Sequence, residues 1–283
     1  DFVHLLRSWF NRGFLVLQQI NWDTSARILD KIVAYEAVHH INDLDDLRRR
    51  LYPPDRRCFA FFHPAMPGEP LIFVEVALTK EIPGSIDGVL SDQRTPLEAD
   101  QAKAAVFYSI SNCQKGLTGI SFGNLLIKQV VSELSLTCPQ IESYVTLSPI
   151  PGLNKWLATQ TEDETHGQTA QTILDGTATP EDVRAMAARY LLLAKRDDGL
   201  PVDPVARFHL GNGAEIHDVH ADADTSSNGM AQSSGAMVNY LYDLTQTERN
   251  HEAFAMEANV IASRGMRALS TTALVTKTKE PTP

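Results

Sequence analysis

The sequence predicts an α+β protein in which a helical segment precedes a region of strands and helices. Two changes of pattern lead to this class. Apolar residues recur at helical spacing in the N-terminal segment, which Pro53 and Pro54 end. From Arg56 onward, short apolar and β-branched runs lie between turn residues, which is typical of strands. We therefore expect two domains: 1–55, the C-terminal part of an all-helical domain, and 56–283, a mixed sheet flanked by helices.

The composition is that of a folded protein with an acidic surface. Of 283 residues, 43% are hydrophobic and 21% are charged, so a sizeable core is expected. The net charge is −10 at pH 7. This charge argues against a nucleic-acid binder, which would show a basic stripe, but is compatible with a small polyanionic ligand in a local basic pocket.

The cysteines and the termini suggest a protein of a reducing compartment. Cys58, Cys113 and Cys138 are odd in number and form no CxxC pair, which argues against a disulfide framework or a structural zinc site. No apolar run is long enough to span a membrane, and we expect no membrane partner. The chain begins within a helical pattern, without Met or a signal peptide, so we expect residues upstream of it. These features and a C-terminus that is not a peroxisomal signal favour the cytoplasm.

Three helices are expected in the first segment. The first is indicated by five apolar residues at helical spacing: Phe2, Leu5, Leu6, Trp9 and Phe10. The second follows Thr24 as N-cap. The third covers Asp43–Leu51, with carboxylates early and arginines late, as the helix dipole favours. The arginine run Arg48–Arg50 is expected to form a solvated face, with a binding role as the alternative.

The remaining elements alternate between strands and helices. Strands are predicted at Cys58–Phe62, Leu71–Leu78, Ala104–Ser111, Tyr144–Leu147 and Ala214–Val219. Helices are predicted at Leu125–Leu134, Pro180–Lys195, Ala236–Leu244 and Glu252–Leu269. The polar segment 158–200 is interpreted as an insertion that covers one side of the core and carries no recognisable chemistry.

The stretch that ends at Ser148 is the first candidate for chemistry. An apolar strand delivers this serine into a turn, and Pro149, Pro151 and Gly152 prevent the strand from continuing. Two prolines so close to a serine fix the backbone on which it sits. The pattern indicates either an ordinary strand end or a hydroxyl that must be aimed.

A glycine-bearing loop at 112–124 joins a strand to an amphipathic helix. Free backbone N–H groups at a helix start bind phosphate without net basic charge, and Lys115 adds one cation. The spacing matches neither the ATP-binding nor the dinucleotide-binding glycine motif. A phosphate cradle and a plain loop both remain open from the spacing.

His209 stands between two apolar residues, just before an Asn-Gly turn. A histidine in this position is either a hydrogen-bonded structural residue or a catalytic one. A cluster of possible metal ligands follows nearby: His217, His220, Asp222 and Asp224. Strand alternation would place the two histidines on opposite faces, and no further spacing supports a site, so no metal is expected.

Taken together, these stretches resemble the malonyl-CoA decarboxylase family. The resemblance is carried by Gln-Lys-Gly-Leu-Thr-Gly at 114–119, Leu-Ser-Pro-Ile-Pro-Gly at 147–152 and Phe-His-Leu-Gly-Asn-Gly-Ala at 208–214. Further support comes from Pro-Gly-Glu-Pro-Leu at 67–71 and from the stretch 235–242. The likeness runs in order along most of the chain and is weaker at 158–200.

The resemblance implies a catalytic domain of the GCN5-related acetyltransferase (GNAT) fold that binds acyl-CoA. The region 105–135 would then be the pyrophosphate cradle for coenzyme A. The implied catalytic residues are Ser148 and His209, with Tyr242 as a candidate orienter or, alternatively, a core tyrosine. Substrate contacts are implied along one loop: Thr118, Gly119, Ile120, Ser121, Phe122, Gly123 and Asn124. A member of the family has a glutamate where this chain has Ser121, so no carboxylate role is carried over to this position.

The implied reaction converts malonyl-CoA to acetyl-CoA and CO2, in fatty acid metabolism, without metal, biotin or another cofactor. Within the pair, Ser148 would be the proton acceptor. His209, with a pKa near the working pH, would be the proton donor. A CoA-dependent acyltransferase and a non-catalytic malonyl-CoA sensor are the alternatives. A serine hydrolase is disfavoured because the serine lies outside a G-x-S-x-G elbow. The family also implies a homo-oligomer, a dimer or tetramer, held through the helical domain.

Overall fold

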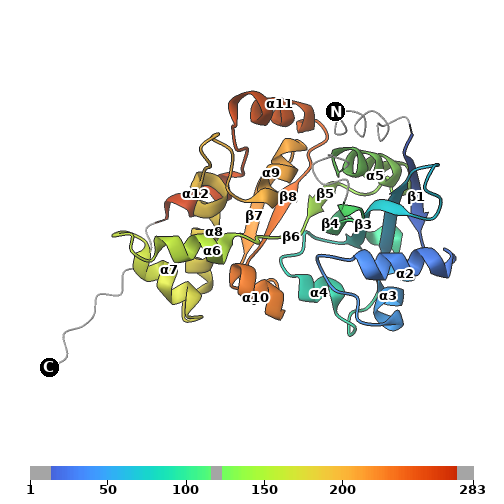
Figure 1. The fold of residues 1–283 in the computed structure, drawn as a ribbon, viewed down its shortest axis with the longest axis horizontal. Helices are drawn as coiled ribbons and strands as arrows, with labels where there is room; N and C mark the ends of the chain where they lie inside the picture. Colours follow the sequence, from blue (N-terminus) through green and yellow to red (C-terminus); the bar gives the residue numbers. More distant parts are fainter. Residues whose placement is uncertain (1–13, 116–122, 273–283) are drawn as a thin grey trace. The chain divides into compact units, whose positions relative to one another are not determined.

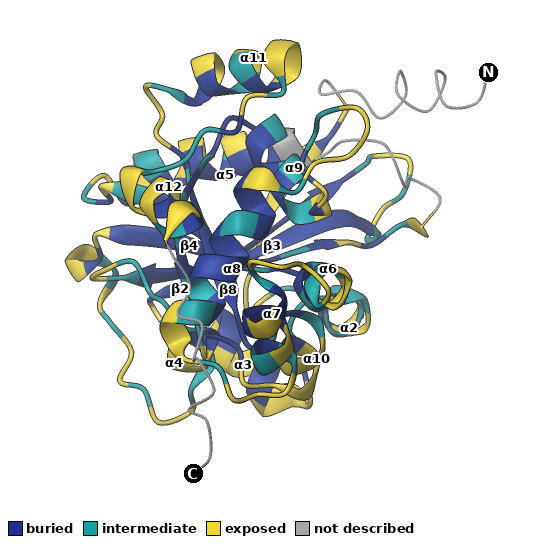
Figure 2. Cartoon of the chain, turned by 90° about the vertical axis from the view of Figure 1, so that its left-hand side faces the viewer, coloured by how far each residue is buried: buried dark blue, intermediate teal, exposed yellow. Residues whose placement is uncertain are grey.

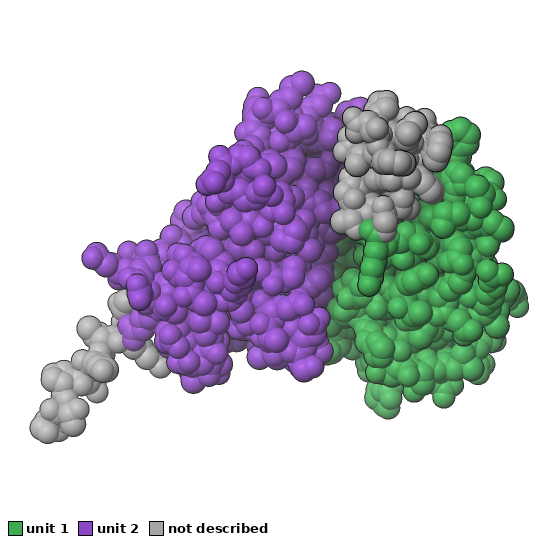
Figure 3. Space-filling view, in the orientation of Figure 1, with its two compact units in different colours: residues 1–147 green, residues 148–283 purple. Residues whose placement is uncertain are grey.

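The chain divides into two compact units, Asp1–Leu147 and Ser148–Pro283, which Figure 3 shows in different colours. The computed structural model describes residues 14–115 and 123–272. Both units contain strands and helices (Figure 1), as the α+β prediction requires. Ser148 is the first residue of the second unit, so the three candidate catalytic residues all belong to that unit.

The first unit is built on a sheet of mixed direction. Its strands are β1 (Val16–Ile20), β2 (Arg56–Phe62), β3 (Pro70–Thr79), β4 (Ala104–Asn112) and β5 (Ser143–Thr146). Neighbours pair in this order, antiparallel from β1 to β4 and parallel between β4 and β5. Residues of β2, β3 and β4 are almost all buried, which Figure 2 shows in dark blue. Strands buried on both faces read as continuous apolar runs, and this is why the sequence revealed them.

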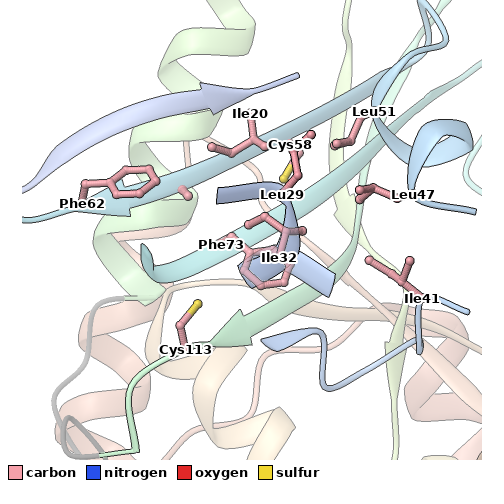
Figure 4. Close-up of a cluster of buried hydrophobic side chains, with 11 residues drawn as sticks. Ile20, Leu29, Ile32, Ile41, Leu47, Leu51, Cys58, Phe62, Phe73 and Cys113 are labelled. Atoms are coloured by element: carbon pink, nitrogen blue, oxygen red, sulfur yellow. The ribbon is translucent and has the colours of Figure 1, made fainter. Parts of the chain in front are cut away.

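Helices cover this sheet. They are α2 (Ala26–Tyr35), α3 (Leu44–Leu51), α4 (Ile86–Leu90), α5 (Gly123–Thr137) and a 3₁₀ turn at Ala99–Gln101. The apolar sides of α2 and α3 pack on the first strands around Cys58 and Phe73 (Figure 4). Burying each large apolar side chain of this kind stabilises the fold by about 1.5–3 kcal/mol.

The N-terminal segment differs from the prediction. Val16–Ile20 forms strand β1, antiparallel to β2, so an all-helical domain before residue 55 is not shown. The second helix begins after Ser25 and not after Thr24, whose hydroxyl instead accepts from the Asn21 backbone N–H at 3.0 Å. The domain boundary expected at residue 55 stays a prediction. The first predicted helix lies outside the described residues.

The second unit holds three strands and seven helices in its described part. The strands are β6 (Ser148–Pro149), β7 (Glu215–His220) and β8 (Met237–Leu241). The helices are α6 (Leu153–Gln160), α7 (Gly167–Leu174), α8 (Pro180–Leu193), α9 (Pro204–Gly211), α10 (Ser227–Ser233), α11 (Thr247–Glu257) and α12 (Arg264–Thr271). Strand β8 pairs antiparallel with both β6 and β7.

Two predictions for this unit were wrong, and one helix was not predicted. The segment predicted as a helix at Ala236–Leu244 is strand β8, because its apolar residues fit helical spacing as well as alternation. The predicted helix Glu252–Leu269 is two helices, α11 and α12, interrupted at Ala258, where the backbone takes a left-handed conformation. His209 lies on helix α9, which was not predicted, although Asp203 and Pro204 are typical of a helix start.

Helix α8 is a central element of this unit and not a cover on one side. Eight of its fourteen residues are buried, and its N-terminus carries a capping box between Thr179 and Asp182. Arg189 donates to the Ser270 carbonyl oxygen at 2.7 Å and thereby ties α8 to α12. Burial of α8 therefore contradicts the expected cover on one side of the core, whereas the interpretation of 158–200 as an insertion stays a prediction.

Candidate active site

Ser148 is held at the start of the second unit by strand pairing. It lies opposite Val238 in the β6–β8 ladder, and its side chain is only 6% exposed. Ile150 and Leu153, which follow within the turn and the start of α6, are completely buried. The prolines end the strand after two residues, so the hydroxyl sits on a backbone that is anchored on both sides.

His209 is delivered by helix α9. The carboxylate of Asp203 caps the N-terminus by accepting from the Ala206 backbone N–H at 2.8 Å, and Pro204 occupies the first turn. The helix ends at Gly211, and the Asn212-Gly213 turn follows, with Gly213 at φ +83°. This short helix holds a 3% exposed histidine in the interior of the unit.

The structure brings Ser148, His209 and Tyr242 together. Ser148 Oγ lies 3.3 Å from His209 Nε2, and the Tyr242 hydroxyl lies 2.8 Å from His209 Nδ1. Both ring nitrogens of the histidine therefore face a hydroxyl. Sixty-one residues separate the serine from the histidine in the chain, so only the fold creates this contact.

Aromatic rings surround the imidazole. Tyr240 stacks on it, with ring centroids 4.4 Å apart and an interplanar angle of 24°. Phe208 and Tyr242 approach it edge-on, at 4.9 and 6.1 Å. Tyr240 lies in β8, and Tyr242 directly follows Leu241, the last residue of that strand. The ring is thereby held in one plane.

Burial keeps this site uncharged. It lowers the pKa of His209 to about 3, so the imidazole is neutral at physiological pH. The expectation of a His209 pKa near the working pH is therefore wrong, because burial lowers it far below that range. Burial also raises the pKa of Tyr242 well above its usual range, and the side chain of Asn212 opposes this shift. The arrangement is a chain of neutral hydrogen-bonding groups.

Three residues near the site were missed by the sequence reading. Asn212 and Tyr240 belong to motifs that were quoted but assigned no role, and Asp203 precedes them. The sequence could have indicated Asn212 as a polar side chain in an apolar motif and Tyr240 as an aromatic residue two positions before Tyr242. Only the folded chain shows that Tyr240 stacks on His209, that the Asn212 side chain acts on Tyr242 and that Asp203 caps the helix of the histidine.

Most of the other predicted site residues cannot be placed. Thr118–Phe122 lie outside the described residues. Gly123 and Asn124 begin helix α5, as a cradle at a helix start would require. Arg50 is buried, which corrects the expectation of a solvated arginine face, whereas Arg48 and Arg49 are exposed.

The possible metal ligands make separate contacts. His220 Nε2 pairs with the side-chain oxygen of Asn239, and His217 faces Glu215 at 3.6 Å. Asp224 accepts from the backbone N–H of Ser226 at 3.0 Å. Within residues 14–115 and 123–272, no group of three or more His, Cys, Asp or Glu side chains is arranged to hold a metal ion. All three cysteines are buried free thiols. In the described part of the chain, no helix is long and apolar enough to cross a membrane.

Comparison with known proteins gives one family. The family described as "Malonyl-CoA decarboxylase C-terminal domain" matches residues 13–280. Mitochondrial malonyl-CoA decarboxylase of Anser anser anser is 38% identical over 92% of this chain. The match covers 58% of that relative, so the chain spans about three fifths of its length.

Solved structures agree in sequence and in fold. Malonyl-CoA decarboxylase from Rhodopseudomonas palustris is 52% identical, with a TM-score of 0.87, over 94% of this chain and 69% of that one. A more distant neighbour is the GNAT-like decarboxylase GphF in complex with isobutyryl-CoA, 19% identical, with a TM-score of 0.51, over 81% of this chain and 99% of that one. The second likeness concerns the fold alone and confirms the predicted GNAT-like architecture.

Proposed function

The chain belongs to the malonyl-CoA decarboxylase family, and from this premise we propose that it converts malonyl-CoA to acetyl-CoA and CO2 at the Ser148–His209 site. The observation that carries the proposal is the 3.3 Å approach of Ser148 Oγ to His209 Nε2 inside a buried, uncharged pair. The activity would make the protein a carboxy-lyase acting in fatty acid metabolism.

The chemistry needs what this site offers. Loss of CO2 leaves a thioester enolate, so negative charge moves onto the thioester oxygen before a proton reaches carbon. A well-placed hydrogen-bond donor stabilises such charge by about 3–4 kcal/mol. Neutral donors in a poorly solvated site suit this task because they do not stabilise the ground-state carboxylate as strongly as a cation would.

We assign the roles of the pair from the hydrogen-bond chain. The Tyr242 hydroxyl donates to His209 Nδ1, which leaves the proton of the neutral ring on Nε2, facing Ser148. The enolate carbon then takes this proton, directly or through the Ser148 hydroxyl, so that a C–H bond forms as the Nε2–H bond breaks. A proton from solvent restores the neutral ring, and overall one malonyl-CoA carboxylate and one proton give acetyl-CoA and CO2. Tyr242 acts by fixing the tautomer.

Substrate anchoring is proposed for the loop that precedes α5. Thr118–Asn124 would hold the CoA phosphates with backbone N–H groups at the helix N-terminus. Replacing Gly119 by Val should then raise KM for malonyl-CoA more than it lowers kcat. Equal affinity for CoA in the variant and the parent would remove this role.

One experiment separates the proposed reaction from its alternatives. The protein is incubated with malonyl-CoA labelled at the free carboxyl group, in the presence of a chelator and without an amine acceptor. A decarboxylase releases labelled CO2 and forms acetyl-CoA in equal amount. An acyltransferase needs the amine, and a sensor returns intact malonyl-CoA, so either result would overturn the assignment.

Assembly and location complete the proposal. We propose a homo-oligomer, a dimer or tetramer, held through the N-terminal helical domain, which light scattering of the full-length protein would test. We also propose the cytoplasmic location that the sequence favours. The relative from Anser anser anser is named mitochondrial, so fractionation of the source cells is the deciding measurement.

A further inference from the structure

Gly152, in the turn that follows Ser148, is in close contact with a buried tyrosine of α8. A Cβ atom built on Gly152 would lie 2.1 Å from the Tyr190 hydroxyl and 3.9 Å from Asp203 Oδ2. A real Cβ does not approach an oxygen so closely, so only glycine fits here. The Tyr190 hydroxyl therefore rests directly against the backbone of the Ser148 turn.

The same hydroxyl contacts the helix that carries His209. The Tyr190 hydroxyl and Oδ2 of Asp203, the N-cap of α9, both lie within 4 Å of the Cβ position of Gly152, and the carboxyl interacts electrostatically with the phenol. Both residues are buried, Tyr190 at 1% and Asp203 at 0% exposure. One phenol thus touches the turn that holds the serine and the residue that starts the helix of the histidine.

Asp203 is connected to the imidazole by a second route. Its charge acts on Tyr240, whose ring stacks on His209 at 4.4 Å. The groups that face the carboxyl are Tyr190 from α8, Tyr240 from β8 and Arg207 from α9 itself. Gly152, Tyr190, Asp203 and Tyr240 therefore link the Ser148 turn to the His209 ring through one close contact, charge and ring stacking.

We propose that Tyr190 and Asp203, seated against Gly152, are positioning residues that hold Ser148 and His209 at their working separation. This inference rests on the proposed decarboxylation for its kinetic consequence, but its structural consequence, a changed environment of His209, can be measured without the reaction. Displacements of about 1 Å at reacting groups lower rates strongly, so the effect belongs in kcat and not in KM.

The test compares Tyr190→Phe, Asp203→Asn and the double variant in the full chain. Phenylalanine keeps the ring and removes the hydroxyl, and asparagine keeps an oxygen to accept from the Ala206 N–H. We expect each single variant to lower kcat about tenfold with KM for malonyl-CoA within twofold. The double variant should be no slower than the slower single variant, because both changes break one contact.

The matched control is Tyr144→Phe, which also removes a buried tyrosine hydroxyl, one hydrogen-bonded to Ser135 at 2.8 Å. It should keep kcat within twofold. The second readout is the nitrogen NMR signals of ¹⁵N-labelled His209, assigned by their loss in His209→Asn. These signals should shift in Tyr190→Phe and stay in place in Tyr144→Phe.

Two results would overturn the inference. One is Tyr190→Phe with unchanged kcat and unchanged His209 signals. The other is a double variant whose loss is the product of the two single losses. If the parent protein forms no acetyl-CoA from malonyl-CoA, the proposed function fails, and the His209 signals still decide the positioning role. Should Tyr190→Phe not fold, Asp203→Asn supplies the same two readouts.

Discussion

Each of the two units buries a cluster of polar side chains. The cluster in the first unit contains paired charges, whereas the groups around His209 in the second unit are neutral. In the first unit, the guanidinium of Arg50 lies 3.2 Å from both Asp46 and Glu75 and donates to the carbonyl oxygens of His39 and His40. Glu36 accepts from Ser109 in the same region. Charges that cannot reach water are here met by other charges and by hydrogen bonds.

In the second unit, the cluster around His209 has no such cation at its centre. The imidazole is neutral, and the groups that touch it are a serine hydroxyl, a tyrosine hydroxyl and a stacked ring. The hydrogen-bond donors of this site therefore have only neutral partners. They are available to a charge that appears only during a reaction.

The difference separates a structural cluster from a reactive one. Even in the first unit, burial and the nearby Glu36 raise the pKa of Glu75 to about 8, although Arg50 opposes the shift. Glu75 therefore holds its proton more tightly than a free carboxyl does, because several carboxyl groups are buried around one guanidinium. The groups in direct contact with the His209 ring are neutral, so removing one of them should alter rates more than stability.

The largest expected effect comes from His209→Asn. Asparagine offers no second ring nitrogen and no proton relay, so kcat should fall about a thousandfold with little change in KM. Steady-state kinetics with malonyl-CoA measure this loss. His166→Asn, a change at another histidine of the second unit, is the control. A similar loss in both variants would show that His209 has no special role.

The opposite signature is expected from Arg50→Met. Methionine removes the cation beside Asp46 together with the buried hydrogen bonds to Glu75 and to two backbone carbonyl oxygens, which should cost about 3–5 kcal/mol of the unfolding free energy. The folded fraction should keep its kcat. Urea denaturation gives the first quantity, and Arg49→Met, at an exposed neighbour, should cost less than 1 kcal/mol. A stable Arg50→Met protein with impaired kcat would reverse the contrast between the clusters.

The neutral histidine should also appear in the pH dependence of stability. Because the pKa of His209 is lowered to about 3 on folding, the unfolded chain binds an additional proton between about pH 3 and 6.5. Stability therefore falls as pH falls through this window. Relative to His209→Asn, the parent should lose about 1.5–2 kcal/mol between pH 6.5 and 5.

The titration of Asp203 changes stability in the opposite direction, and comparing the parent with His209→Asn cancels this contribution. Burial raises its pKa to about 6, so the native state holds the additional proton between pH 3.8 and 6, and stability falls as pH rises. Parent and His209→Asn share this contribution. Parallel stability curves for the two proteins would mean that His209 titrates normally in the folded chain.

The sequence predicted the strands of the first unit better than the elements around the site. Runs such as Leu71–Leu78 are apolar on both faces, and this pattern is local. Strand β8 was misread because the spacing of Met237, Tyr240 and Leu241 fits a helix as well. Pairing with β6 and β7 decides its structure, and pairing is not visible in local spacing.

The site itself came from resemblance more than from residue patterns. Local patterns left Ser148 and His209 open between structural and catalytic roles, and only their family motifs joined them. No role was predicted for Tyr190, because it lies in the segment that was interpreted as an insertion. Its contacts with Gly152 and Asp203 join positions that are distant in the chain and carry no motif of their own.

The smallest effect is expected from Tyr242→Phe, which tests whether the neutral cluster needs its outer hydroxyl. Phenylalanine keeps the edge-on ring and removes the 2.8 Å hydrogen bond to Nδ1. The ring can then carry its proton on either nitrogen, so kcat should fall about fivefold to tenfold. Nitrogen NMR of His209 should show both tautomers in the variant and mainly the Nε2–H form in the parent. If the parent already shows the Nδ1–H form, the serine must be the donor of the pair, and the roles assigned to Ser148 and His209 exchange.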